Sequence, residues 1–220
     1  MTLMRYNPIL FDLDGTLCDP GPGIVDSVQF ALKSLGIVET DKDKLRSFVG
    51  PPLHHTFNRV YSMDEATTHK AVRLYRERFQ AEGIHEYRAY PGVIALLERL
   101  KENGAQLAVA TSKIESFAKQ ILKATAMIDY FGYVVGTDPH NPQPKAATIS
   151  EALQHFHRAG ISITSAIMVG DKEHDIIGAN ENFIDSVGVL FGYGTQQELE
   201  ASGATHIVNS VAALTGLLLS

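Results

Sequence analysis

Short apolar runs that alternate with segments of helical periodicity constrain the fold of this chain more than any other feature. The runs are residues 8–11, 107–110, 133–135, 166–169 and 186–190. Each is too short for a typical helix and is flanked by polar or turn residues, so we expect buried strands. Strands that alternate with helices favour a parallel sheet covered by helices on both faces, and the sequence therefore predicts an α/β fold.

The helical segments lie between the later strands. They are residues 92–103, 114–126, 145–158 and 174–183. Gly104 and Gly160 stand where C-terminal caps are expected, because glycine tolerates the left-handed backbone of that position.

The alternation of strands and helices stops after the first strand. Residues 24–35, 42–48 and 64–81 have helical patterns, and we find no convincing strand among them. We interpret residues 19–86 as a helical cap domain, and residues 1–18 with 87–220 as the core domain. Hinges are expected near Gly21 and Gly92.

Length, charge and cysteine content exclude several classes of protein. A chain of 220 residues suits one large domain with a smaller appendage. The net charge is −6 and no block of Lys and Arg is present, so we expect no nucleic-acid partner.

Cys18 is the single cysteine, which leaves no intramolecular disulfide and favours a reducing compartment. We find no signal-peptide pattern and no apolar stretch long enough for a bilayer, and we predict a cytoplasmic location without a membrane partner. The oligomeric state stays open.

Polar residues that suit phosphate chemistry follow the predicted strands. They are Asp12, Asp14, Gly15 and Thr16 after the first strand, Thr111 and Ser112 after the second, Lys145 at a helix start, and Asp171 and Asp175 after the fourth. Ligands of open α/β sheets bind beyond the carboxyl ends of the strands, so we expect these residues to gather at one edge. A phosphoryl group repels a carboxylate nucleophile unless cations neutralise it, and Mg²⁺ held by carboxylates supplies that charge.

The same residues resemble the motifs of the haloacid dehalogenase superfamily. Residues 11–17, FDLDGTL, resemble its first motif, and residues 110–113, ATSK, its second. Lys145 resembles the third motif, and the Gly-Asp pair at residues 170–171 with Asp175 resembles the fourth. The resemblance implies a Rossmann-like parallel sheet core with a type-one helical cap domain inserted after the first strand.

The resemblance also implies a role for each residue. Asp12 would be the nucleophile that forms an aspartyl-phosphate, Asp14 the general acid and base, and Thr111 and Lys145 the groups that stabilise the phosphoryl charge. Gly15, Thr16 and Ser112 would lie against the phosphate, with Thr16 also supporting Asp14. Mg²⁺ would be held by Asp12, by the backbone carbonyl of Asp14, by Asp171, and by Asp175 directly or through water.

Some positions allow simpler interpretations. The third motif commonly reads Lys-Pro, whereas Ala146 follows Lys145, so the placement of the ammonium is open and Lys145 also fits a solvated helix residue. Ser112 fits the N-cap of the next helix. Asp175 fits the first turn of a helix, where the helix dipole favours an acidic residue.

Histidines are numerous, but we expect most of them to be surface residues. His54 and His55 have no partner Cys or second His pair at zinc spacing. They follow a Gly-Pro-Pro turn at residues 50–52, and with Arg46 and Arg59 they are candidates to contact the leaving group of a substrate. A purely structural turn is the alternative.

The overall prediction is a magnesium-dependent phosphatase for a small-molecule phosphomonoester. The sequence as a whole, including the Phe-Val-Gly-Pro-Pro-Leu segment at residues 48–53 of the predicted cap, is similar to bacterial phosphoglycolate phosphatases and to a 5′-nucleotidase-like subgroup, and we favour the latter. A phosphoglycolate phosphatase, a β-phosphoglucomutase-like mutase and a non-catalytic relative are the alternatives. Dehalogenases lack the second carboxylate, so Asp14 argues against dehalogenation.

Overall fold

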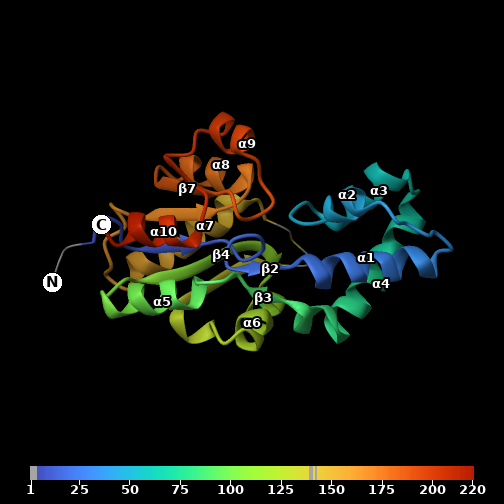
Figure 1. Cartoon of the computed structure of the whole chain (residues 1–220), viewed down its shortest axis with the longest axis horizontal. Helices are drawn as coiled ribbons and strands as arrows, with labels where there is room; N and C mark the ends of the chain where they lie inside the picture. The colour runs from blue at the N-terminus through green and yellow to red at the C-terminus, as the bar shows by residue number, and fades with distance from the viewer. Residues whose placement is uncertain (1–3, 139–140, 142) are drawn as a thin grey trace. The chain divides into compact units, whose positions relative to one another are not determined.

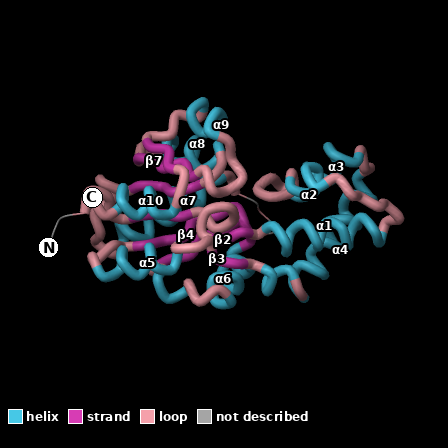
Figure 2. Tube along the Cα trace, viewed as in Figure 1, coloured by secondary structure: helices cyan, strands magenta, loops and turns pink. Residues whose placement is uncertain are grey.

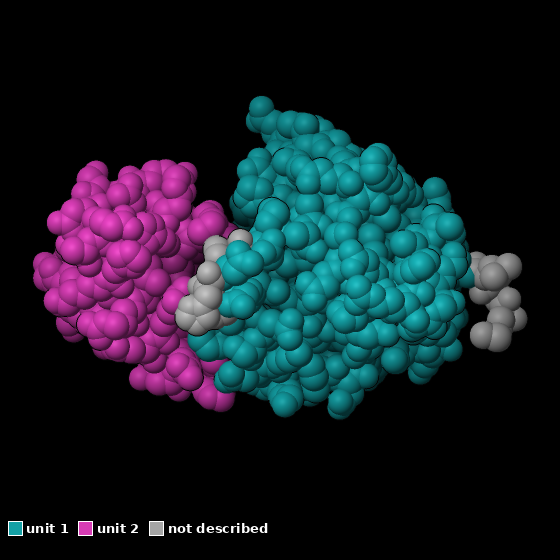
Figure 3. Space-filling model, turned by 180° about the vertical axis from the view of Figure 1, so that it is seen from behind, with its two compact units in different colours: residues 1–19, 89–220 teal, residues 20–88 magenta. Residues whose placement is uncertain are grey.

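The computed structural model describes residues 4–138, 141 and 143–220. The chain divides into two compact units, residues 1–19 with 89–220 and residues 20–88 (Figure 3). Among the described residues, no helix is both long enough and apolar enough to cross a membrane.

The larger unit is built on a six-stranded sheet with the order β5-β4-β1-β6-β7-β8. Figures 1 and 2 show the strands of this unit with helices packed around them. Its strands are β1 (Ile9–Phe11), β4 (Leu107–Ile114), β5 (Tyr133–Thr137), β6 (Ile167–Gly170), β7 (Asp185–Val189) and β8 (His206–Val208). All neighbouring pairs are parallel, with Phe11 in register with Val109 on one side and Val169 on the other. This sheet confirms the predicted α/β core.

Helices follow most of these strands. They are α5 (Val93–Glu102), α6 (Glu115–Ala124), α7 (Lys145–Arg158), α8 (Glu173–Glu181), α9 (Gln196–Ala201) and α10 (Val211–Leu218), with a short 3-10 helix at Ile128–Tyr130. Gly104 and Gly160 have φ angles of 82° and 75°, the left-handed conformation expected after a helix end. The sequence patterns did not predict β8, α9 or α10.

Alternating side chains of the strands bury both faces of the sheet. Leu10, Ala108 and Met168 pack with Ile149 and Phe156 of α7 in one apolar cluster. On β1 the next residue, Phe11, instead meets Phe131 edge-on at 6.3 Å between ring centroids. Burial on both faces explains why these strands are continuous apolar runs in the sequence.

The smaller unit is helical apart from loops and Arg88, the first residue of β3, as predicted for the insert. It contains α1 (Gly21–Ser34), α2 (Lys42–Arg46), α3 (Leu53–Tyr61), α4 (Glu65–Ala81) and a 3-10 helix at Gly83–Glu86. Phe48 and Phe57 lie 4.7 Å apart between ring centroids in its interior. Helix α3 was not predicted, because it is short and has a prolyl N-cap without a side-chain hydrogen bond. A two-stranded sheet pairs β2 (Cys18–Asp19) with β3 (Arg88–Ala89). The hinges near Gly21 and Gly92 remain predictions.

Candidate active site

A tight turn follows β1 and positions the first two acidic residues. The Asp12 amide donates to the Val169 carbonyl at 2.9 Å, which continues the sheet pairing by one residue. The Gly15 amide then donates to the Cys18 carbonyl at 2.8 Å, closing the turn. Gly15 has a φ of 83°, and a Cβ at this position would overlap the Asp171 carboxylate. Only glycine therefore fits both the backbone conformation and the close approach.

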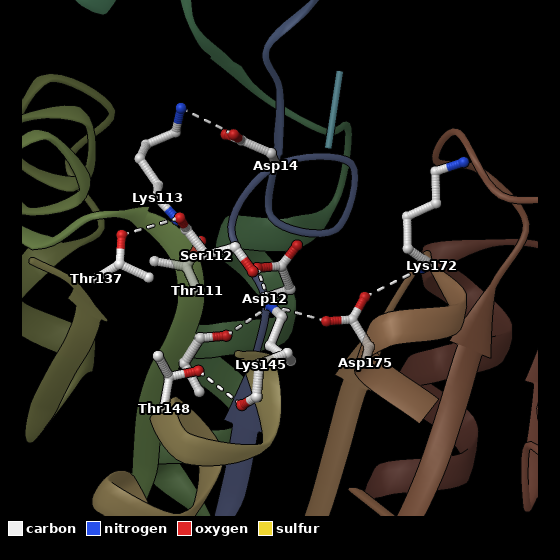
Figure 4. A network of polar contacts seen from close by, with 11 residues as sticks. Asp12, Asp14, Thr111, Ser112, Lys113, Thr137, Lys145, Thr148, Lys172 and Asp175 are labelled. Atoms are coloured by element: carbon white, nitrogen blue, oxygen red, sulfur yellow. Dashed lines mark hydrogen bonds and ion pairs between the residues drawn. The ribbon is translucent and has the colours of Figure 1, made fainter. Parts of the chain in front are cut away.

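Lys145 is the first residue of α7, and its ammonium lies buried among acceptors (Figure 4). Its Nζ donates to Asp12 Oδ1 at 2.6 Å and to the Ala110 carbonyl at 3.0 Å, and it pairs with Asp175 Oδ1 at 2.8 Å. Burial disfavours the charged ammonium, but the carboxylates of Asp12 and Asp175 outweigh it and raise the pKa of Lys145 above its ordinary value. The interpretation of Lys145 as a solvated helix residue is therefore wrong.

Asp12, Asp171 and Asp175 bring carboxylate oxygens within 4.8 Å of one another, and all three residues are buried. Burial, with the charges of Asp175 and Asp12, raises the pKa of Asp171 well above its ordinary value. Burial also raises the pKa of Asp175 to about 6, although Lys145 opposes the shift. Asp171 Oδ1 is buried without a hydrogen-bond partner among the described residues. Such a crowded set of oxygens fits a hard divalent cation.

Glycines and backbone amides hold these carboxylates in place. The Tyr193 amide donates to Asp171 Oδ2 at 2.8 Å, and the Lys172 amide donates to Asp175 Oδ2 at 3.0 Å. A Cβ on Gly192 would overlap the Asp171 side chain. This loop was not among the residues predicted for the site. One signal could have indicated this loop: Tyr193 is flanked by Gly192 and Gly194 and follows a predicted buried strand of the same sheet.

Asp14 pairs with Lys113, the last residue of the ATSK segment and not one of the predicted site residues. Lys113 Nζ lies 2.9 Å from Asp14 Oδ2, and the two side chains are only 10% and 14% exposed (Figure 4). Thr16 Oγ1 is buried and has no hydrogen-bond partner among the described residues, so its expected support of Asp14 is not a hydrogen bond in this structure. Cys18 is buried, and burial raises the pKa of its thiol to about 12, which disfavours a second nucleophile.

Strand β4 is longer than predicted and includes Thr111 and Ser112. It runs to Ile114, which pairs with Thr137 of β5, and the next helix begins at Glu115. Neither residue is therefore a helix N-cap, and that interpretation of Ser112 is wrong. Thr111 is buried, and its hydroxyl accepts from the Lys113 amide at 3.3 Å. Ser112 is exposed, and its carbonyl accepts from the Thr137 hydroxyl at 3.2 Å.

Comparisons with known proteins show the family to which this chain belongs. The sequence model described as haloacid dehalogenase-like hydrolase matches residues 9–189. This chain belongs to the haloacid dehalogenase-like hydrolase family. It is similar to a 5′-nucleotidase of Pseudomonas aeruginosa, with 41% identity over 98% of this chain and 96% of that protein. It is also similar to a phosphoglycolate phosphatase of Neisseria meningitidis, with 34% identity over 90% of this chain and 86% of that protein.

A solved structure supports the same family. The crystal structure of a predicted phosphatase from Clostridium acetobutylicum matches with a TM-score of 0.86 and 42% identity, over 96% of this chain and 97% of that one. As a phosphatase of the haloacid dehalogenase-like hydrolase family, this protein acts on phosphoesters, and its buried aspartate cluster is able to hold a metal ion.

Proposed function

We propose that this haloacid dehalogenase-like phosphatase hydrolyses a small phosphomonoester through an aspartyl-phosphate on Asp12. The observation that carries the proposal is the convergence of Lys145 with the Asp12, Asp171 and Asp175 carboxylates beyond the ends of β1 and β6. A nucleophilic carboxylate beside a buried ammonium suits attack on a phosphoryl group, because the ammonium neutralises charge as it develops.

The proposed metal is Mg²⁺, held by the carboxylates of Asp12, Asp171 and Asp175 and by the Asp14 carbonyl. The oxygen-only ligand set supports this choice, since Mg²⁺ prefers carboxylate and carbonyl oxygens. When bound, Mg²⁺ would neutralise charge on the phosphoryl group and on the crowded carboxylates.

The proposed reaction has two steps. In the first, a carboxylate oxygen of Asp12 forms a bond to phosphorus while the ester P–O bond breaks, and Asp14 gives its proton to the leaving alkoxide. In the second, Asp14 takes a proton from water, whose oxygen bonds to phosphorus as the aspartyl-phosphate bond breaks. Phosphate leaves and Asp12 is regenerated. Thr111, Lys145 and the Gly15, Thr16 and Ser112 positions would hold the phosphoryl oxygens.

A nucleoside 5′-monophosphate is the proposed substrate, and the cytoplasm the proposed location. The name of the Pseudomonas aeruginosa relative, 5′-nucleotidase, and its 41% identity support the choice of substrate. Phosphoglycolate is the second candidate, favoured by the name of the Neisseria meningitidis relative at 34% identity. Contacts from Arg46, His54, His55 and Arg59 to the leaving group remain a prediction.

The test is phosphate release from nucleoside 5′-monophosphates, phosphoglycolate and sugar phosphates, in Mg²⁺ and in EDTA. We expect release that requires Mg²⁺ and is fastest with a nucleotide. Asp12→Asn should abolish the phosphoenzyme, whereas Asp129→Asn, at an exposed residue, serves as the control. A phosphoglycolate preference would replace the substrate assignment, and release by Asp12→Asn at the wild-type rate would overturn the covalent mechanism. No release from any ester by the folded protein would favour a mutase or a non-catalytic role.

A further inference from the structure

The helical unit contains a second group of metal-ligating side chains, separate from the aspartate cluster. His54 lies in the first turn of α3, and Glu65 and His69 lie one turn apart at the start of α4. The sequence indicates no metal site at His54, because no partner stands at zinc spacing, and His54 is predicted there only as a candidate contact to the leaving group. His54 and His69 lie on different helices, α3 and α4, so no short sequence spacing indicates this pair.

The three side chains converge on one point. His54 Nε2 lies 3.1 Å and His69 Nε2 3.0 Å from the same oxygen, Glu65 Oε1. A tetrahedral Zn²⁺ with bonds of about 2.0–2.1 Å separates neighbouring ligand atoms by roughly 3.3 Å. The observed separations are a few tenths of an ångström shorter, which a small rotation of exposed side chains removes.

The separation of the two imidazole rings also matches two ligands of one ion. Their centroids lie 5.0 Å apart and their planes are inclined by 60°. Two Nε2-bound imidazoles on one tetrahedral zinc place their centroids about 5 Å apart, given Zn–N bonds of about 2.0 Å. The ring separation therefore matches a shared ion without any movement of the two helices.

We propose that His54, Glu65 and His69 form a zinc site on the helical unit. Two imidazoles and one carboxylate are a donor set that Zn²⁺ binds, with the fourth position left to water or to another ligand. The set differs from the active-site cluster, because imidazole nitrogen selects zinc-like transition metals whereas the aspartate oxygens suit Mg²⁺.

Bound zinc would fasten the first turn of α3 to the first turn of α4. Helix α3 has nine residues and no side-chain hydrogen bond at its N-cap, so tertiary contacts must stabilise it. In the absence of metal, the bridge consists of contacts between side chains that are 42%, 70% and 68% exposed for His54, Glu65 and His69. Exposed contacts of this kind stabilise little, so the ion would supply most of the link.

The experiment is calorimetric titration of the untagged protein with Zn²⁺, in a constant excess of Mg²⁺ that occupies the aspartate cluster. We expect one zinc per chain that is lost or weakened about 10–100-fold in His69→Ala, the range reported for removing even indirect ligand support. His55→Ala is the matched control and should bind like the wild type. Glu65→Gln should bind more weakly than the wild type.

A second measurement protects the test against unfolding and against zinc at the aspartate cluster. Thermal melts without metal should show His69→Ala folded like the wild type, because His69 is exposed. In the same excess of Mg²⁺, Zn²⁺ should stabilise the wild type and His55→Ala more than His69→Ala. Zinc bound at the aspartates would persist in every variant. Equal zinc isotherms for wild type and His69→Ala would overturn the proposal. None of these readouts depends on phosphatase activity.

Discussion

Lys145 Nζ lies 2.6 Å from Asp12 Oδ1, although 133 residues separate the two in the sequence. The contact forms because β1 ends at Phe11 and α7 begins at Lys145 on the same edge of the sheet. Both side chains are nearly buried, at 6% exposure for Lys145 and 11% for Asp12. An ammonium in this position offsets the carboxylates around it, and in the proposed mechanism it would also neutralise the negative charge of a bound phosphoryl group.

Replacement of Lys145 by Met should therefore affect both activity and stability. Without a donor to the phosphoryl oxygens, phosphate release should fall about 10²–10³-fold. Removing one partner of a buried ion pair typically costs about 3–5 kcal/mol, so the metal-free protein should lose stability by a similar amount. Stopped phosphate-release assays and denaturant melts measure the two effects.

The control for this variant is Lys119→Met. Lys119 pairs with Glu115 at 2.6 Å on the surface of α6, where the side chains are 47% and 41% exposed. An exposed pair at this spacing is worth about 0.3–0.5 kcal/mol, so stability and activity should barely change. A Lys145→Met protein as active as Lys119→Met would contradict the proposed role of the buried ammonium.

The sequence predicted the parts of this molecule in which local pattern and tertiary environment agree. Helix α7 spans Lys145–Arg158, the predicted range, because its apolar spacing matches a helix packed on the sheet. The predicted end of β4 was wrong. Ser112 and Lys113 are polar, yet they remain in the strand because β4 pairs with β5 as far as Ile114. Strand β8 was missed because it is a three-residue strand, His206–Val208, whose residues are only partly buried.

At the site, too, the sequence predicted the residues placed by topology and not the contacts that depend on strand length and loop path. Asp12, Asp171 and Lys145 follow or precede apolar segments, so topology alone brings them to one edge. The Lys113–Asp14 ion pair depends on how far β4 extends, and the Tyr193 amide reaches Asp171 through a loop without a periodic pattern. Side-chain direction and loop path are tertiary properties, and no local spacing encodes them.

Gly192→Ala should damage the site without touching an ionisable group. A Cβ at residue 192 would overlap the Asp171 side chain and the Gly15 carbonyl, so one of them must move. Because site geometry is sensitive to shifts of about 1 Å, we expect phosphate release to fall about 10²-fold and the Mg²⁺ requirement to rise. Activity measured across a Mg²⁺ titration tests both expectations.

Gly216→Ala is the matched control for that substitution. Gly216 lies within α10, and a Cβ there meets nothing within 4 Å. Alanine is favoured over glycine inside a helix by about 0.5–1 kcal/mol, so this variant should be fully active and slightly more stable. If Gly192→Ala retained wild-type activity and Mg²⁺ dependence, the close approach to Asp171 would not matter for the site.

Asp171→Asn should separate stability from function. Burial and the charges of Asp175 and Asp12 raise the pKa of Asp171, which means that its ionised form is unfavourable in the metal-free fold. A neutral amide of the same shape still accepts from the Tyr193 amide, whose bond to Oδ2 is 2.8 Å. We expect a higher melting temperature in EDTA, by about 2–4 °C for each kcal/mol gained, together with loss of phosphatase activity. A lower melting temperature in EDTA would show that the carboxylate is not strained without metal.

The raised pKa values of Asp171 and Asp175 also predict how stability depends on pH. An unfolded aspartate has a pKa of about 3.9, whereas that of Asp175 in the fold is about 6. Between these values the folded protein binds more protons than the unfolded chain. The free energy of unfolding of the metal-free protein should therefore fall as pH rises through this window. Metal binding requires the ionised carboxylates, so Mg²⁺ should stabilise the fold little near about pH 5 and strongly above about pH 7.

Thermal melts in EDTA and in Mg²⁺ between those pH values measure this effect. The difference in melting temperature between the two conditions should grow with pH, and most of the growth should lie around the pKa of about 6 of Asp175. Asp175→Asn lacks the titrating group, so its melting temperature in EDTA should depend less on pH than that of the wild type. A stabilisation by Mg²⁺ that is equal at both ends of the range would mean that the ion binds elsewhere, because the aspartate oxygens must lose their protons before they can hold it.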